Sequence, residues 1–383
     1  MKNVSNTGAY NFYDFVFSKA LRSLSHVVGL RKITQPFWSR WLASGVRSEV
    51  IFRFLDRLGS IDGWASAAKD AADDEIARYH AALPNLDTDQ KIAFLRELSY
   101  ICNLAQWGCL PLSQTRKDLY LKCRDYYIEA ESLAFPDTYE RLGIPFEDLV
   151  LHGNLHRPVG APAPLIVIVH GVDGCKEEHL ATELHYLEQG FCVLGFDGPG
   201  QAEALVIDDT LWRSSYPLAI SAAIDAVEQL GGINTQNTGV LGISIGSTWA
   251  LQACAKDRRI KAVYDLGGLL HTRSFAKYPF LIKTRICQLS GAQDKVSVAK
   301  ALRTNTIEDE TFLASIRADI RILHGSSDRI VKQEDKVWLR DKLQELVPGI
   351  DVSMKVIEGG DHCCTGHADE VRQDSATFFD RLL

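Results

Sequence analysis

The sequence predicts an α/β fold built on a doubly wound, mainly parallel sheet, and three observations carry that prediction. Apolar strand-like segments alternate with helical ones from residue 164 to the end of the chain. The run 164–169 is apolar and β-branched without alternation, as in strands covered on both faces. Residues 238–254 pass from an apolar strand through Gly-Ile-Ser-Ile-Gly directly into a helical segment. We therefore expect helices on both faces of one sheet.

Composition narrows the class of protein. A net charge of −7 without any block of basic residues argues against nucleic acid or an anionic membrane as the main partner. No apolar run approaches the roughly 20 residues of a membrane span. The nine cysteines show no framework spacing, and Cys192 and Cys254 lie inside apolar runs, so we expect them to be reduced and buried. With no signal-peptide pattern at the start, a cytoplasmic location is expected.

Residues 1–140 are predicted to form a helical domain that serves as a cap or in dimerisation. Apolar residues recur at helical spacing there, and residues 62–63 indicate the start of a helix. Residues 84–87 are predicted to form a break between two helices. The tryptophans are expected in its core, with an aromatic substrate wall as the alternative. The residues that carry these patterns are Phe12, Phe15, Phe17, Leu21, Leu24, Val50, Phe54, Leu58, Trp38, Trp41, Trp64 and Trp107.

Residues 141–383 are predicted to form the domain that contains the sheet. Two early strands are expected within 145–156, joined near Gly153. Segment 267–318 is too long for a plain connection, so we expect it to be an insertion with helices of its own above the sheet. The remaining expected elements are strands at 164–170, 191–196, 240–243, 261–265, 319–324 and 352–357, and helices at 176–189, 213–230, 247–254, 333–346 and 368–382.

The segment around Ser244 predicts a nucleophile elbow, a tight turn between a strand and a helix with the serine at its apex. Such a turn strains the backbone and brings strand and helix almost into contact. Gly242 and Gly246 suit it because they have no Cβ. The simpler alternative is a Gly/Ser turn in another α/β protein.

Asp328 and His362 follow the last two predicted strands, and with Ser244 they form the order Ser, Asp, His. Parallel strands end at one edge of the sheet, so these side chains are expected to meet there. A hydroxyl would attack, an imidazole would carry its proton and a carboxylate would orient the imidazole. Asp361 competes for the acid role, but it is adjacent to His362 and should point elsewhere. His271 and His367 compete with His362 for the role of base, but only His362 among these three lies just past a predicted strand.

A glycine-rich turn after the first buried strand, residues 170–174, supplies the remaining part of the predicted site. The backbone N–H of Val172 and that of Ile245 are expected to form an oxyanion hole. Residues 197–201 are predicted to be only a tight strand-to-helix turn, because Pro199 removes an amide that a phosphate would need. A metal site at 361–367 is the weaker alternative for the last loop, because adjacent cysteines chelate poorly. We expect no metal and no cofactor.

Together these motifs resemble a branch of the α/β-hydrolases with an amino-terminal helical domain. That branch includes 2,6-dihydroxypseudooxynicotine hydrolase and the polyketide chain-shortening hydrolases of fungal pigment and bacterial anthraquinone pathways. The resemblance covers about residues 120–383, and the chain departs from it where Ala202 replaces the usual glycine. The residues that carry it lie at 126–130, 139–141, 144–147, 170–178, 197–201, 242–246 and 359–364.

The resemblance implies a homodimeric enzyme that cleaves a carbon–carbon bond of a β-dicarbonyl substrate by a retro-Claisen reaction. Ser244 would form an acyl-enzyme, and a polyketide, free or bound to a carrier protein, would be the substrate. Ester or thioester hydrolysis proceeds through the same acyl-enzyme and stays open as an alternative. A catalytically silent binding protein with this fold is the distant third.

Overall fold

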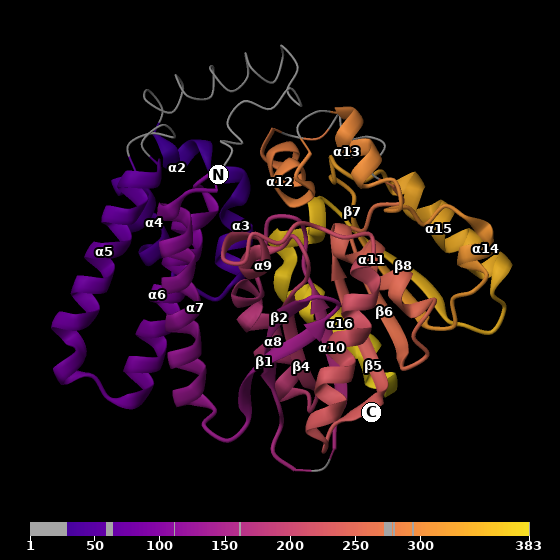
Figure 1. Cartoon of the computed structure of the whole chain (residues 1–383), viewed down its shortest axis with the longest axis horizontal. Coiled ribbons are helices and arrows are strands. Elements are labelled where there is room, and N and C mark those ends of the chain that lie inside the picture. The colour runs from indigo at the N-terminus through magenta and orange to yellow at the C-terminus, as the bar shows by residue number, and fades with distance from the viewer. Residues whose placement is uncertain are drawn as a thin grey trace. The chain divides into compact units, whose positions relative to one another are not determined.

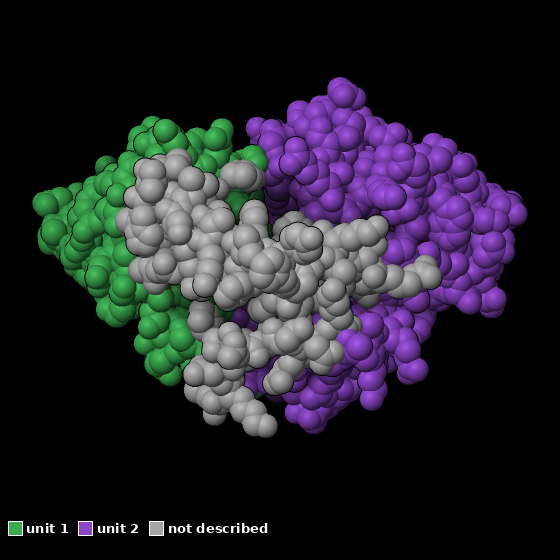
Figure 2. Space-filling model, turned by 90° about the horizontal axis from the view of Figure 1, so that it is seen from above, with its two compact units in different colours: residues 1–139, 206–208 green, residues 140–205, 209–383 purple. Residues whose placement is uncertain are grey.

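The computed structural model describes residues 29–58, 64–110, 112–160, 162–271, 278, 280–292 and 295–382. The chain divides into two compact units, coloured separately in Figure 2. Unit 1 comprises Met1–Tyr139 and Val206–Asp208, and unit 2 comprises Glu140–Leu205 and Asp209–Leu383. The helical spacing from Phe12 to Leu24 and the helix start at 62–63 lie outside the described residues.

The described part of unit 1 is helical (Figure 1). Its longest helices follow the predicted break at 84–87. Helix α6 begins at Thr88 because Asp87 caps it: the Asp87 carboxylate accepts from the Gln90 backbone N–H, and the Gln90 side chain accepts from the Asp87 N–H. The helices are α2 Leu30–Ile33, α3 Trp38–Ala43, α4 Ser48–Arg57, α5 Trp64–Ala82, α6 Thr88–Trp107 and α7 Gln114–Ala134, with 3₁₀ turns at Gln35–Phe37 and Leu83–Asn85.

The core of unit 1 contains the aromatic residues that the sequence placed there. Trp41, Trp64 and Trp107 are buried, which confirms that prediction for these three, whereas Trp38 is half-buried. The indole of Trp64 donates to the Ala105 carbonyl oxygen at 2.9 Å and fills the space beside Gly108 that a Cβ would need. Val50, Phe54 and Leu58 are also buried, along one face of α4 and just beyond its end.

Unit 2 is built on an eight-stranded sheet in the order β1-β2-β4-β3-β5-β6-β7-β8. Strand β2 pairs antiparallel with β4, and every pairing from β4 across to β8 is parallel. This arrangement confirms the predicted doubly wound sheet. The strands are β1 Tyr139–Phe146, β2 Leu149–His156, β3 Pro164–Val169, β4 Cys192–Asp197, β5 Asn234–Ile243, β6 Ile260–Leu266, β7 Asp319–Gly325 and β8 Val352–Ile357.

Helices flank this sheet (Figure 1). One core cluster of buried side chains includes residues of its strands and of two of these helices. In this cluster the rings of Tyr186 of α8 and Phe379 of α16 meet edge to face. Ile166 of β3 and Leu241 of β5 belong to the same cluster, because alternate residues of a strand point to the same face of the sheet. The helices of unit 2 are α8 Leu180–Glu188, α9 Ala202–Val206, α10 Tyr216–Leu230, α11 Ile245–Cys254, α12 Phe280–Ser290, α13 Lys295–Ala301, α14 Glu310–Leu313, α15 Gln333–Leu346 and α16 Ala368–Phe379, with 3₁₀ turns at Lys176–His179, His362–His367 and Asp380–Leu382.

The predicted turn near Gly153 is wrong. Strands β1 and β2 are joined instead through Glu147 and Asp148, and Gly153 lies inside β2 opposite Phe196 of β4. A Cβ on Gly153 would come within 2.8 Å of a Leu194 methyl group, so this glycine serves close strand packing. Glu147 takes the left-handed conformation, φ 53°, that the sequence pattern assigned to a glycine.

The segment between β6 and β7 carries α12, α13 and α14 within its described residues. No disulfide joins any of the nine cysteines, all of which are described, and all but Cys363 are buried, as expected for Cys192 and Cys254. None of the described helices has both the length and the apolar character needed to cross a bilayer. Because β3 and β5 to β8 run parallel, their carboxyl ends share one edge of the sheet, and the segments that follow β5, β7 and β8 there hold Ser244, Asp328 and His362.

Candidate active site

Ser244 lies at the apex of a strained turn between β5 and α11. Its backbone has φ 56° and ψ −127°, a conformation that costs a non-glycine residue of the order of 1–3 kcal/mol. Two hydrogen bonds hold the turn: the Ser244 N–H donates to the Leu266 carbonyl oxygen of β6 at 2.8 Å, and the Ser247 hydroxyl donates to the Gly242 carbonyl oxygen at 2.6 Å. The elbow is thus anchored to its own strand and to the next.

The two glycines beside Ser244 are required by close contact, as the sequence predicted. A Cβ on Gly242 would collide with the backbone of Ser247. A Cβ on Gly246 would collide with the carbonyl oxygens of Val169 and His170 at the end of β3. Helix α11 can therefore begin against the strands only because both positions lack a side chain.

Ser244, His362 and Asp328 form a hydrogen-bonded chain. Nε2 of His362 lies 2.9 Å from Oγ of Ser244, and Nδ1 lies 2.8 Å from Oδ2 of Asp328. The Asp328 side chain is fully buried, whereas the His362 side chain is 21% exposed. The serine hydroxyl therefore faces one nitrogen of an imidazole whose other nitrogen is bound by a buried carboxylate.

Asp328 is held as a carboxylate by several donors. Its Oδ1 accepts from the backbone N–H groups of Ile330 and Val331 at 2.7 and 3.0 Å, while Oδ2 faces His362. Burial alone would raise the pKa of Asp328. The bond and charge of His362 and the two backbone donors outweigh burial, so its pKa lies below the ordinary value. The carboxylate is ionised at neutral pH.

Asp361 has a different role from Asp328. It is the N-cap of the turn His362–His367, and its two carboxylate oxygens accept from the Thr365 N–H at 2.7 Å and the Thr365 hydroxyl at 2.8 Å. Both oxygens therefore face Thr365. The carboxylate that lies against Nδ1 of His362 is that of Asp328.

The loop that carries His362 packs tightly on the end of β7. A Cβ on Gly325 would collide with the Gly360 and Asp361 carbonyl oxygens, so this glycine allows the close approach. Burial opposes the charged imidazole, but the adjacent Cys363 side chain and Asp328 outweigh it, and the pKa of His362 lies well above its ordinary value. His362 is therefore readily protonated in this setting.

The glycine-rich turn after β3 lies beside Ser244. A Cβ on Gly171 would come within 3.3 Å of the Ser244 Cβ and 3.8 Å of its Oγ. Val172 is the next residue. Ile245 is the first residue of α11, so its backbone N–H has no acceptor within the helix. Two loops that carry candidate oxyanion donors therefore adjoin the same hydroxyl.

The turn after β4 does more than reverse the chain, which the sequence did not reveal. Gln201, 1% exposed, donates from Nε2 to the carbonyl oxygens of His170 and Gly171 at 2.8 and 3.0 Å. Its Oε1 accepts from the Gly198 N–H at 2.9 Å and from the Tyr216 hydroxyl. The two glycine-rich turns are thus bound together through one buried amide.

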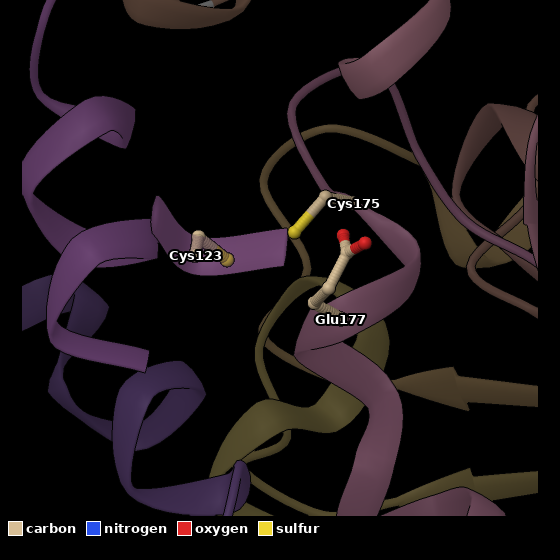
Figure 3. A group of neighbouring side chains, drawn as sticks. All are labelled: Cys123, Cys175 and Glu177. Carbon is tan, nitrogen blue, oxygen red and sulfur yellow. The ribbon is translucent and has the colours of Figure 1, made fainter. Parts of the chain in front are cut away.

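Behind these turns lies a buried ion cluster centred on Lys176. Its Nζ lies 2.8 Å from Asp197, 2.7 Å from Glu203 and 2.9 Å from Glu177, a residue labelled in Figure 3. Arg141 of β1 pairs with the second oxygen of Glu203 at 2.6 Å. The cluster therefore joins β1, β4, α9 and the segment before α8.

Charges in this cluster stabilise one another. Burial acts against each charged form, yet the three carboxylates raise the pKa of Lys176 well above its ordinary value. Lys176 and His170 lower the pKa of Asp197, and Lys176 and Arg141 lower that of Glu203 to about 2. For Glu177 burial prevails and its pKa is raised. Lys176, Asp197 and Glu203 are accordingly charged at neutral pH.

A second buried ion pair lies near the carboxyl end of β6, the strand between β5, which leads to Ser244, and β7, which leads to Asp328. Asp265 of β6 binds Nζ of Lys336 at 2.6 Å and accepts from the Gly268 N–H at 2.8 Å. The sequence offered one signal for this pair, an acidic residue near the carboxyl end of an otherwise apolar strand. Asp265 is therefore paired with Lys336, whereas the carboxylate that contacts His362 is that of Asp328.

Comparison with known proteins relates this chain to α/β-hydrolases. The chain is 26% identical over 331 residues to 2,6-dihydropseudooxynicotine hydrolase of Paenarthrobacter nicotinovorans, covering 85% of this chain and 86% of that protein. It is 34% identical over 143 residues to the hydrolyase ccsE of Aspergillus clavatus, and 30% identical over 173 residues to the hydrolyase poxO of Penicillium oxalicum. Those two matches span about a third of the fungal proteins, 31% and 38%. No family model matches the chain.

Solved structures agree with this relationship at the level of the fold. The crystal structure of 2,6-dihydroxy-pseudo-oxynicotine hydrolase superimposes with a TM-score of 0.77 at 23% identity, covering 90% of this chain and 95% of that one. The structure of AbyA5 superimposes with a TM-score of 0.71 at 16% identity, covering 93% and 95%. The chain has the α/β-hydrolase fold, and its relatives in sequence include hydrolases.

Proposed function

Proceeding from the α/β-hydrolase fold, we propose that this chain is a serine-dependent enzyme that cleaves a carbon–carbon bond of a β-dicarbonyl substrate. The observation that carries the proposal is the hydrogen-bonded chain from Ser244 through His362 to Asp328. A neutral imidazole takes the hydroxyl proton while the carboxylate stabilises the cation that forms. The hydroxyl then attacks a substrate carbonyl carbon.

In the retro-Claisen step, the tetrahedral adduct on Ser244 collapses and the bond between the two carbonyl-bearing fragments breaks. The leaving carbon takes the electron pair as an enolate, and protonated His362 returns the proton to it. Water, deprotonated by His362, then attacks the acyl ester and releases a carboxylic acid and free Ser244. The sum is one water consumed, one ketone released and one acid released.

Backbone donors stabilise the oxyanion in both halves of this reaction. We assign them to the N–H groups of Val172 and Ile245, whose loops adjoin the Ser244 hydroxyl. A single well-placed donor contributes about 3 kcal/mol to transition-state stabilisation. No metal or organic cofactor enters this mechanism.

Carbon–carbon cleavage is preferred to ester hydrolysis on the strength of the resemblance, because the attacking groups are common to both reactions. A relative that matches most of the chain is named for the hydrolysis of 2,6-dihydropseudooxynicotine. We propose a polyketide, free or carrier-bound, as the substrate. Product analysis by mass spectrometry after incubation with matched 1,3-diketones, esters and thioesters tests this choice. Turnover confined to the esters or thioesters would overturn it.

The serine assignment has its own test. A fluorophosphonate probe should label the wild type on Ser244, whereas Ser244→Ala should fold and yet lose label and about 10⁴-fold or more of turnover. Ser375→Ala is the control, because it removes a buried serine hydroxyl outside the elbow, one that is hydrogen-bonded to Tyr186. An adduct on another residue, or comparable kcat in Ser244→Ala, would contradict the mechanism. Absence of labelling in the wild type would favour the non-catalytic alternative.

Two further parts of the proposal concern organisation. Residues 1–140 and the insertion 267–318 are proposed to cover the active site of the catalytic domain 141–383, because controlled protonation of a carbanion favours exclusion of water. The protein is also proposed to be a homodimer. Sedimentation equilibrium of the full chain at micromolar concentration checks the dimer, and a mass equal to one chain would count against it.

A further inference from the structure

The amide of Gln201 is bound at both of its ends. Its nitrogen donates to the carbonyl oxygens of His170 and Gly171 at 2.8 and 3.0 Å. Its oxygen accepts from the Gly198 N–H at 2.9 Å and from the buried Tyr216 hydroxyl. If this amide were flipped, its oxygen would face the two carbonyl oxygens, and its NH₂ group would face the Gly198 N–H and the Tyr216 hydroxyl. Its orientation is therefore determined by these four partners.

The Gly171 carbonyl that Gln201 holds belongs to the same peptide group as the Val172 N–H. A trans peptide group is planar, and its C=O and N–H point in opposite directions. Whatever fixes the direction of the Gly171 oxygen therefore fixes the direction of the Val172 N–H as well. Gln201 acts on this N–H from the opposite side of the turn.

The turn after β3 requires such a restraint because of its glycine. Gly171 has no Cβ, since one would press on Ser244, and a glycine gives the adjoining peptide group unusual rotational freedom. The imidazole of His170 adds a second restraint, with Nδ1 3.0 Å from the Gly171 oxygen and Nε2 2.8 Å from Asp197. Asp197 is in turn fixed by Lys176 in the buried ion cluster.

We propose that Gln201 is a positioning residue for oxyanion stabilisation. It holds the Gly171–Val172 peptide group with its N–H directed at the negative charge that forms when Ser244 attacks a carbonyl or phosphonyl group. The inference rests on the proposed function, because it presumes attack by Ser244. It assigns a role to the turn 197–201 beyond the reversal of the chain.

The test measures the rate at which a fluorophosphonate labels Ser244, because the phosphonyl oxygen occupies the oxyanion position. Gln201→Glu keeps the shape and the acceptor for Gly198 but, as a carboxylate, has no donor for Gly171, and Gln201→Met is a neutral alternative of similar length that has no donor at all. In both variants the maximal labelling rate should fall about 10²-fold with the half-saturating probe concentration unchanged. Tyr186→Phe is the matched control: it removes a buried hydroxyl that is hydrogen-bonded to Ser375 of α16, and should label within about threefold of the wild type.

Each outcome discriminates. If the probe does not label the wild-type protein, the proposed function itself is contradicted, and this outcome is distinct from a failure of the role assigned to Gln201. A labelled wild type with variants that melt at lower temperature but label at the wild-type rate makes Gln201 merely structural and overturns the inference. A third measurement needs no variant, namely a crystal structure of the phosphonylated wild type. The phosphonyl oxygen should lie within hydrogen-bond distance of the Val172 nitrogen, and an oxygen directed elsewhere overturns the inference.

Discussion

At the scale of single residues, the two acidic side chains nearest His362 differ in what they bind. Asp328 contacts the imidazole and two backbone amides, whereas both oxygens of Asp361 bind Thr365. Asp328→Asn should therefore fold but lower kcat by about 10⁴-fold, because the amide favours the wrong imidazole tautomer. Asp361→Asn should keep kcat within a few-fold and cost about 1 kcal/mol in unfolding free energy as a weakened cap. Parallel assays and urea titrations check both, and the reverse ranking would contradict the assignment.

The raised pKa of His362 predicts the pH dependence of Ser244 reactivity. Only the neutral imidazole can accept the serine proton, so labelling should decline as the pH falls through a midpoint above about 6.5. The Cys363 side chain contributes to that rise. In Cys363→Ala, the midpoint should accordingly move to lower pH with little change in the rate at high pH. An unmoved midpoint in the labelling rate against pH would remove Cys363 from this account.

His362 and Asp328 together make the stability of the fold depend on pH, and the raised pKa of His362 and the lowered pKa of Asp328 give the direction of that dependence. A raised pKa means that protonated His362 stabilises the fold below about pH 6.5, a contribution lost as the pH rises through its folded-state pKa. A lowered pKa means that ionised Asp328 stabilises the fold above about pH 3.9, a contribution lost as the pH falls through its folded-state pKa. The pair therefore contributes most at mildly acidic pH, where reactivity is already declining.

Residues of the site differ in how far the sequence could predict them. Ser244, Asp328 and His362 each follow an apolar strand in a loop rich in small residues, so strand-end reasoning selected them. Gln201 and Lys176 gave no such signal. Lys176 opens the run Lys-Glu-Glu-His, which resembles an exposed helix start, yet it is buried against Asp197 of β4 and Glu203 of α9, and Arg141 of β1 binds Glu203 in turn. Burial of that kind depends on tertiary contacts that no local pattern records.

At the scale of elements, strands and helices with strong local signals were predicted closely. Helix α15 and strand β8 have the bounds expected from their apolar spacing and flanking turns. The β1–β2 connection was misplaced because Glu147 adopts a positive φ without being glycine. Helix α9 was missed because five residues are too few to show a helical period. It begins at Ala202, which has φ 22° at the position where the resemblance expects glycine.

The ion cluster that joins four elements predicts a large and pH-dependent cost of removing its cation. Lys176→Met leaves the buried carboxylates of Asp197 and Glu203 without their main partner and should lower the unfolding free energy at pH 7 by about 3–5 kcal/mol. The deficit should shrink at pH 5 as those carboxylates take up protons. Lys342→Met, at a partly exposed lysine paired with Glu310 and Glu345, should cost far less, because solvent screens such surface pairs. Equal losses in urea titrations would contradict the account.

At the scale of the whole molecule, the proposed cover over Ser244 makes a specific structural prediction. A crystal structure of the full chain with a bulky aromatic phosphonate on Ser244 should place side chains from residues 1–140 and from 267–318 against the bound group. Both segments are rich in apolar residues. Their described residues lie outside the strands of the sheet, apart from Tyr139 and Glu140 at the start of β1. A bound group touched by neither segment would make the helical region an element of assembly alone.

The positions of the three reactive residues along the chain have a consequence for folding. Ser244 and His362 are 118 residues apart, and their contact requires β8, which leads into the His362 loop, to have joined the sheet. Closing so long a loop occurs late relative to local helix formation. A nascent or truncated chain that ends before β8 therefore contains the serine but no base to activate it. Acquired reactivity of Ser244 would report that the last strand has docked, and incomplete chains would remain chemically inert.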